Sequence, residues 1–170
     1  MPFNLIKKYN ELLDILSFDE KDCKESLRGI FNRDIRNNKR FLFRGKPIYP
    51  TPKNDGEDSM GNLFNHLTRK KVDKDECHRE FDRNRSVRLH WIKYHIEENK
   101  KEKMLYFSVN EPRRKIRTYI YDKDEKYVII LEPLRNKTAY YLLTAYPLMG
   151  KDAARNKILK KYKTKLDEVY

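Results

Sequence analysis

The fold is decided by three strand-like segments, Ile116-Arg-Thr-Tyr-Ile-Tyr121, Tyr127-Val-Ile-Ile-Leu-Glu132 and Ala139-Tyr-Tyr-Leu-Leu-Thr-Ala-Tyr146. Each is rich in β-branched and aromatic residues, which favour strands. Polar turns, Asp122-Lys-Asp-Glu125 and Leu134-Arg-Asn-Lys137, separate them. With Leu105-Tyr-Phe-Ser-Val109 as a fourth strand, the short connections predict an antiparallel meander of four consecutive strands.

Patterns typical of helices occur both before and after these strands in the sequence. Apolar residues between Leu5 and Leu16 recur at helical spacing. Ser17 and Glu20 form a capping box that predicts a second helix over about 18–31. Further helices are expected from about residue 62, over 79–99 and over 152–168, the last of them basic. A short strand is expected at 40–44.

The order of these elements predicts an α+β domain: N-terminal helices, a four-stranded antiparallel meander sheet and a basic C-terminal helix. We expect residues 1–46 to form a helical extension packed on the core. Residues 47–61 carry Pro47, Pro50, Pro52, Gly56 and Gly61 and predict a long loop. Residues 62–170 form the α+β domain proper.

The composition argues against disordered, membrane-spanning and disulfide-rich secreted proteins. The chain has 170 residues, 39 Lys and Arg against 26 Asp and Glu, and a net charge of +13. Its 12 tyrosines and 8 phenylalanines argue against a disordered chain. No apolar run is long enough for a membrane span, no signal peptide is recognisable, and two cysteines are too few for a secreted disulfide framework. We expect a cytoplasmic protein with no membrane partner.

The positive charge is concentrated in residues 21–46, 100–117 and 151–165, with aromatic residues interleaved. Lysine-rich helices are often only solvated surfaces, but three separate basic segments indicate a nucleic acid or another polyphosphate as partner. Composition does not separate RNA from DNA. The candidate binding residues are Arg44, Lys46, Arg69, Lys70, Arg113, Arg114, Lys157, Lys160 and Lys161.

Several polar residues fall where apolar ones are expected. In a helix over 79–99, Arg88 and His95 share a stripe within the apolar arc, Arg85 flanks it, and His90 faces water. A guanidinium there either binds a phosphate in a cleft or pairs with a buried acid such as Glu132. His95 is expected to be a core histidine.

His66 follows the long loop and precedes a basic segment. Its pKa range suits proton transfer at physiological pH, although a lone histidine on a short helix is more often structural. On the strands, Arg117 shares a face with Tyr119 and Tyr121, and Tyr140, Leu142, Thr144 and Tyr146 are expected to share one face. These hydroxyl and guanidinium groups surround a scissile phosphate or form a half-exposed aromatic face.

The sequence offers little to hold a metal ion. Cys77-His78 has no spaced partner, Cys23 is distant, and Asp55, Glu57 and Asp58 have no second carboxylate group at a fixed spacing. No phosphate-binding glycine loop is present. The residue types therefore favour metal-independent chemistry without a cofactor, which suits RNA because its own 2′-hydroxyl is the nucleophile.

Five segments of the second half resemble the barnase, colicin-ribonuclease and RelE superfamily of toxin-like nucleases, especially its phage and mobile-element forms. They are Asn65-His-Leu-Thr68, Arg85-Ser-Val-Arg-Leu-His-Trp-Ile92, Arg117-Thr-Tyr-Ile-Tyr121, Tyr127-Val-Ile-Ile-Leu-Glu132 and Tyr141-Leu-Leu-Thr-Ala-Tyr-Pro147. The resemblance covers about residues 60–165. It implies a small metal-independent ribonuclease, often a toxin or defence effector, with His66, Arg85 or Arg88, Arg117 and Thr144 at its site.

We therefore expect an endoribonuclease in which His66 is general base or acid. Arg88 and Arg117 neutralise the phosphate, and Thr144 and Tyr146 position it or relay a proton. RNA is the expected partner, with an acidic antitoxin or immunity protein covering the basic cleft. The alternatives are a non-catalytic nucleic-acid-binding regulator and an inhibitor that docks on a host nucleic-acid enzyme.

Overall fold

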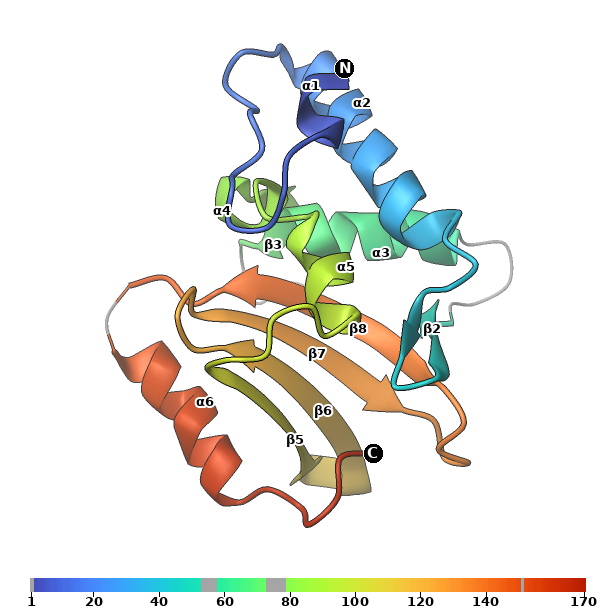
Figure 1. The fold of residues 1–170 in the computed structure, drawn as a ribbon, viewed down its shortest axis with the longest axis vertical. Helices are drawn as coiled ribbons and strands as arrows, with labels where there is room; N and C mark the ends of the chain where they lie inside the picture. Colours follow the sequence, from blue (N-terminus) through green and yellow to red (C-terminus); the bar gives the residue numbers. More distant parts are fainter. Residues whose placement is uncertain (1, 53–57, 73–78, 151) are drawn as a thin grey trace.

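A six-stranded sheet organises the protein in the computed structural model, which describes residues 2–52, 58–72, 79–150 and 152–170 (Figure 1). Its strand order is β1-β2-β8-β7-β6-β5. The strands are β1 (Leu42–Phe43), β2 (Lys46–Pro50), β5 (Met104–Glu111), β6 (Lys115–Asp122), β7 (Tyr127–Pro133) and β8 (Tyr140–Pro147). The four predicted strands pair consecutively and antiparallel. The α+β class is confirmed.

The sheet is larger than predicted because the segment expected to be a loop supplies a strand. Strand β2 runs parallel to β8, with Ile48 opposite Tyr140, and β1 pairs with β2 as a hairpin. Gly45 at φ +80 makes the turn between β1 and β2, a backbone conformation that glycine adopts without strain. The predicted loop over 47–61 is therefore wrong at both ends, since α3 (Ser59–Thr68) begins before residue 62.

The N-terminal region is less helical than predicted. Helix α1 (Pro2–Leu5) is a single turn, and the residues up to 16 form a loop. The Asn4 side chain donates to the Asp14 carbonyl at 2.8 Å and accepts from the Asp14 amide at 2.9 Å, so the loop closes on itself instead of continuing as a helix. Helix α2 (Glu20–Phe31) is capped by Asp19 instead of Ser17 and continues into the π-turn η1 (Asn32–Arg36).

The predicted helix over 79–99 is wrong. Strand β4 (Arg79–Phe81) pairs with β3 (Arg69–Lys71), and two short helices follow, α4 (Arg83–Ser86) and α5 (Trp91–Ile96). Asp82 caps α4, so a new helix starts two residues after the end of the hairpin at Phe81. The helical wheel drawn for 79–99 therefore does not apply. His90, expected at the surface, is buried with its Nε2 3.1 Å from the Lys8 carbonyl, and burial lowers its pKa.

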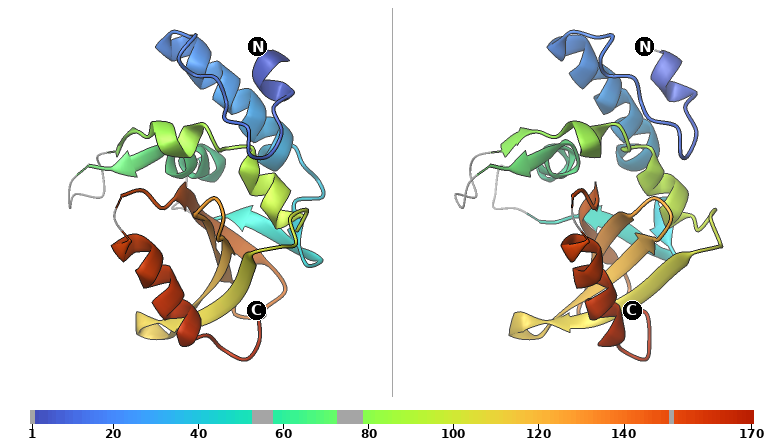
Figure 2. Two further views of the ribbon diagram at one scale, coloured as in Figure 1. Left: turned by 60° about the vertical axis from the view of Figure 1, so that its left-hand side comes forward. Right: turned by 90° about the vertical axis from the view of Figure 1, so that its left-hand side faces the viewer.

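Helices cover both faces of the sheet (Figure 2). On one face, α2, α3 and α5 enclose a core that includes residues from Leu13 to Ala145. This core joins residues of the N-terminal region to those of the sheet, so residues 1–46 pack on the core. On the other face, α6 (Ala153–Lys163) packs Ile158 against Phe107, Tyr119 and Val128.

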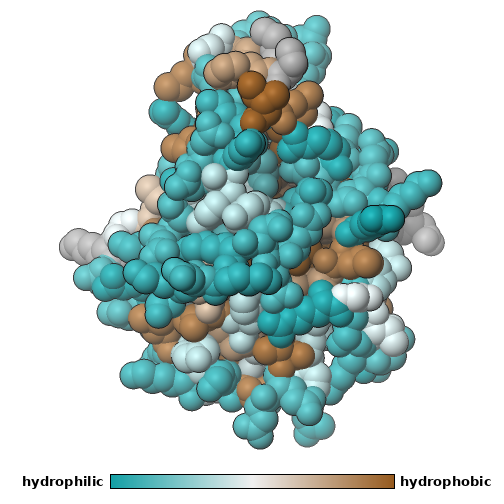
Figure 3. All heavy atoms as spheres, in the orientation of Figure 1, coloured by the Kyte–Doolittle hydropathy of each residue, from teal (hydrophilic) through white to brown (hydrophobic). Residues whose placement is uncertain are grey.

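The face shown in Figure 3 is mostly hydrophilic, with apolar patches over the N-terminal end. The exposed large apolar residues there are Phe3, Leu5, Ile6, Leu12 and Leu16. In the described parts of the chain, no helix has both the length and the apolar character needed to cross a bilayer.

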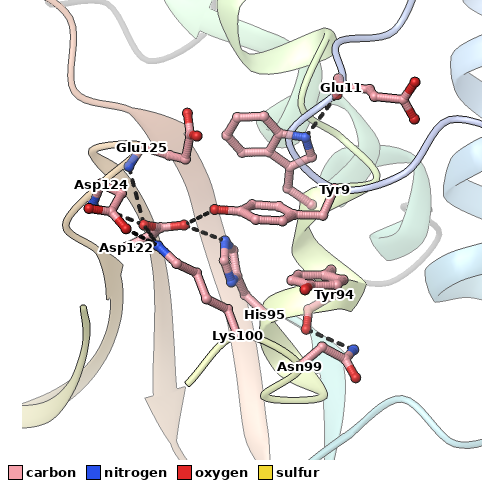
Figure 4. A network of polar contacts seen from close by, with 10 residues as sticks. Tyr9, Glu11, Tyr94, His95, Asn99, Lys100, Asp122, Asp124 and Glu125 are labelled. Carbon is pink, nitrogen blue, oxygen red and sulfur yellow. Dashed lines mark hydrogen bonds and ion pairs between the residues drawn. The ribbon is translucent and has the colours of Figure 1, made fainter. Parts of the chain in front are cut away.

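A buried carboxylate ties the N-terminal loop to the sheet (Figure 4). Asp122, at the end of β6, is fully buried and accepts hydrogen bonds from the Tyr9 hydroxyl and from Lys100 at 2.5 Å. His95 Nε2 lies 3.2 Å from the same carboxylate. Burial alone raises the pKa of Asp122, but the contacts from His95, Lys100 and Tyr9 outweigh it and hold that pKa well below its usual range. His95 is thus a core histidine, as expected.

We predict that Asp122→Asn lowers the free energy of unfolding by about 3 kcal/mol, because it leaves the Lys100 ammonium without its buried partner. Urea denaturation measures the change. The matched control is Asp124→Asn, which removes an exposed carboxylate that also contacts Lys100. Equal unfolding midpoints for the two variants would contradict a stabilising role of the buried network.

The difference between the wild type and Asp122→Asn should also depend on pH. Because the folded-state pKa of Asp122 is depressed, its contribution is complete above the unfolded-state pKa of about 4 and is lost as the pH falls through the folded-state value. Urea denaturation at pH 6 and pH 2.5 should therefore show a large difference at the higher pH and a smaller one at the lower. A constant difference would contradict the ionised state of Asp122.

Candidate functional site

A cavity of about 730 Å³ opens between α3, the β3–β4 hairpin, α4 and the middle of β8. We call it the His66 cavity. Three of the predicted site residues, His66, Arg85 and Thr144, line it together with the predicted binding residue Lys70. The remaining lining residues are Thr51, Pro52, Ser59, Asn62, Leu63, Lys71, Arg79, Leu142 and Leu143.

Helix α3 presents His66 to this cavity. Its apolar residues Leu63, Phe64 and Leu67 are buried, which fixes the rotation of the helix and leaves His66 half-buried. Nη2 of Arg79 lies 3.4 Å from His66 Nδ1. An arginine can only donate, so in this contact Nδ1 is the acceptor.

Arg85 connects the walls of the cavity. Its Nη1 donates to the carbonyls of His66 at 2.9 Å and Arg69 at 3.2 Å, and to the Thr144 hydroxyl at 3.3 Å. Its Nε lies 3.2 Å from the carboxylate of Asp82. One guanidinium thus links the end of α3, the start of β3 and strand β8. The half-buried position strengthens these charge-assisted contacts.

A β-bulge turns Thr144 toward the cavity. Ile130 pairs with Thr144 but Leu131 pairs with Leu142, so Leu143 is an extra residue in β8. The predicted single face for Tyr140, Leu142, Thr144 and Tyr146 is therefore wrong. Tyr140 and Leu142 belong to the α3 side of the sheet, whereas Tyr146 packs with the core on the α6 side.

Tyr146 does not line the cavity. Its ring lies 5.1 Å from the Arg85 guanidinium carbon in a cation–π contact. Burial raises the pKa of its hydroxyl, although the positive charge of Arg85 acts in the opposite direction. The neutral Tyr146 ring thus packs against the Arg85 guanidinium outside the cavity.

The two arginines expected to bind phosphate lie elsewhere. Arg117 is on β6 and forms an ion pair with Glu132 of β7. Arg88 stacks over the Trp91 ring at 5.3 Å, and its Nη1 donates to the Asn84 carbonyl at 2.7 Å. Glu132 is thus the partner of Arg117 and not of Arg88. Neither arginine lines the His66 cavity.

The other predicted binding residues are dispersed. Arg44 pairs with Glu98 at 3.0 Å, and Lys46 lies over the Tyr140 ring. Arg69 lines a separate, mostly apolar cavity beside α2. The predicted residues of the β5–β6 turn and of α6 are not among those that line the cavity: Arg113, Arg114, Lys157 and Lys160 are exposed, and Lys161 pairs with Glu111.

Sequence reasoning missed Arg79 and Lys71 of the cavity wall. The strands that carry them have three residues each, too few to show the alternation that identifies a strand. Arg79 had been assigned to the start of a long helix. Ser59 and Asn62 were missed because the start of α3 was placed three residues too late.

The donor atoms of the cavity are those of imidazole, hydroxyl, amide and cationic groups. Among the described lining residues there is no carboxylate, the ligand that divalent ions prefer. Nor does any cluster of three or more His, Cys, Asp or Glu side chains occur in the described segments. Cys77, His78, Asp55 and Glu57 lie outside the described residues. The lining is suited to binding an anion and moving a proton.

Comparison with known proteins gave no match for this chain among protein-family models, curated proteins or solved structures. The resemblance to toxin-like nucleases therefore stays an expectation from the sequence.

We predict that Arg85→Gln lowers the free energy of unfolding by about 2 kcal/mol, because it removes charge-assisted hydrogen bonds to two carbonyls and a hydroxyl. Urea denaturation measures the loss. Arg83→Gln is the matched control, since Arg83 lies on the same short helix and is exposed. If both variants unfold at the same urea concentration, Arg85 does not hold the cavity walls together.

Proposed function

We propose that the protein is a metal-independent endoribonuclease that cuts RNA in the His66 cavity. The observation that carries this proposal is the convergence of His66, Arg85 and Thr144, from three separate elements, on one cavity rimmed by Lys70 and Arg79. The group includes a residue that can exchange a proton near neutral pH, cations for a phosphate and a hydroxyl to orient it. Cleavage by the RNA 2′-hydroxyl requires these parts.

In the proposed reaction, His66 takes the proton of the 2′-hydroxyl as this oxygen attacks the adjacent phosphorus. The bond between phosphorus and the 5′-oxygen then breaks, the leaving oxygen takes a proton from water, and the protonated His66 returns its own proton to the solvent. Lys70 and the cavity-facing side of Arg85 stabilise the additional negative charge on the phosphate. Thr144, already bonded to Arg85, orients a phosphate oxygen.

The contact with Arg79 keeps His66 from acting as a base before substrate binds. While the Arg79 guanidinium donates to Nδ1, that nitrogen is not ready to accept a proton. A phosphate entering the cavity attracts the guanidinium more strongly than an imidazole nitrogen does, because arginine pairs with phosphate through charge-assisted hydrogen bonds. Substrate binding thus frees Nδ1 to act as the base.

We predict that the purified protein cleaves single-stranded RNA in EDTA and that His66→Ala lowers the rate at least 100-fold, the size of a general acid–base contribution. Denaturing gels with end-labelled RNA measure the rate. His90→Gln is the control, because His90 is buried outside the cavity. Circular dichroism confirms that each variant is folded.

Two results would contradict this function. If wild-type protein leaves RNA intact, or needs Mg²⁺ to cut it, the proposed chemistry is wrong. RNA that is bound but not cut would favour a nucleic-acid-binding regulator. Cleavage that survives in His66→Ala would place the base elsewhere.

A ribonuclease of this type, acting in the cytoplasm, needs restraint in the cell that produces it. The cationic rim of the His66 cavity offers Lys70, Lys71 and Arg79 to an acidic protein. An antitoxin or immunity protein that covers this rim is therefore part of the proposal.

A further inference from the structure

A second cavity, of about 460 Å³, lies on the other side of α4 from the His66 cavity. Arg83, Asn84, Val87 and Arg88 form one wall, and the N-terminal loop of residues 12–16 forms the other. We call it the Arg88 cavity. Arg85, between Asn84 and Val87 in the sequence, lines the His66 cavity instead. The two cavities are thus separated by the width of α4, which for a helix with its side chains is roughly 10–12 Å.

Arg88 is only partly satisfied in this position. Its Nη1 bonds to the Asn84 carbonyl, whereas its Nε is buried and has no hydrogen-bond acceptor among the described residues. Nor does Arg83 or Arg88 form an ion pair within the described segments. Burial lowers the pKa of Arg88, although the negative charges of Glu125 and Asp82 act in the opposite direction.

Asp14, the one carboxylate among the described lining residues of the Arg88 cavity, makes its hydrogen bonds within its own loop. Asp14 accepts from the amides of Leu16 and Ser17 and from the Ser17 hydroxyl, the last at 2.7 Å. Its charge is therefore shared among donors of the N-terminal loop. The two arginines leave the cavity with an excess of positive charge.

We propose that the Arg88 cavity is a second phosphate-binding site, held by Arg83 and Arg88, that binds the backbone of the RNA strand outside the cleavage cavity. A phosphate gives a desolvated guanidinium the anionic acceptor that the described residues do not supply. An RNA strand leaving the His66 cavity across α4 meets Arg83 and Arg88 on its path. The RNA part of this inference rests on the proposed function, whereas phosphate binding does not.

Trp91 provides a reporter for the site. It is the only tryptophan in the chain, and the Arg88 guanidinium carbon lies 5.3 Å from the centre of its ring. Inorganic phosphate should change the tryptophan fluorescence in a saturable way, whereas chloride at the same ionic strength should not. Arg83→Gln should weaken this response at least threefold. This variant is informative because Arg83 is exposed and its loss leaves the fold intact.

Anisotropy of a labelled single-stranded RNA tests the backbone contact. In a His66→Ala background, Arg83→Gln combined with Arg88→Lys should raise the dissociation constant several-fold and reduce the salt dependence by about one phosphate contact. Arg135→Gln, an exposed arginine in the β7–β8 turn, is the matched control and should bind RNA as the parent does.

The outcomes separate the two proposals. A fluorescence response to phosphate that depends on Arg83, in a protein that cuts no RNA, supports the phosphate site and overturns the ribonuclease. Identical responses to phosphate and chloride overturn the site whatever the cleavage result. If the double variant binds RNA with the affinity and salt dependence of Arg135→Gln, the Arg88 cavity does not hold the RNA backbone.

Discussion

The contacts of Arg85 hold the candidate site together. This single guanidinium bonds to the carbonyls that end α3 and begin β3, and to the hydroxyl of Thr144 on β8. Asp82 balances its charge, and the Tyr146 ring supports it. The elements it joins are distant in the sequence, so nothing local would bring His66 and Thr144 to the same cavity. A partly buried cation that connects several elements is costly to remove, which makes the site a structural unit as well as a chemical one.

The sheet and the N-terminal region also shape the surface around this site. The bulge at Leu143 directs Thr144 toward α3, and β2 extends the sheet beyond β8 so that Thr51 and Pro52 complete the wall. Farther away, Asp122 fixes Tyr9 to β6 and so anchors the loop that borders the Arg88 cavity. The N-terminal segment is therefore part of the architecture that shapes the surface around α4.

The sequence predicted the strands of the meander well, because long apolar segments separated by polar turns have few alternative structures. The resemblance to toxin-like nucleases implied a site with His66, Arg85 or Arg88, Arg117 and Thr144, and three of these residues, His66, Arg85 and Thr144, line one cavity. Arg88 and Arg117 were misplaced for physical reasons: a capped new helix at Asp82 changed the direction of Arg88, and Glu132 was paired across strands with Arg117. Hairpin β3–β4 and the bulge were not predictable, since each depends on tertiary pairing and not on local pattern.

We propose that RNA supplies its own nucleophile in the His66 cavity. Attack by the 2′-hydroxyl requires that the upstream fragment end in a 2′,3′-cyclic phosphate or a 3′-phosphate and that the downstream fragment begin with a 5′-hydroxyl. Mass spectrometry of the fragments from a defined oligonucleotide measures these ends directly. Cyclic phosphate and 5′-hydroxyl ends are the predicted result, and fragments with 5′-phosphate and 3′-hydroxyl ends would contradict the account.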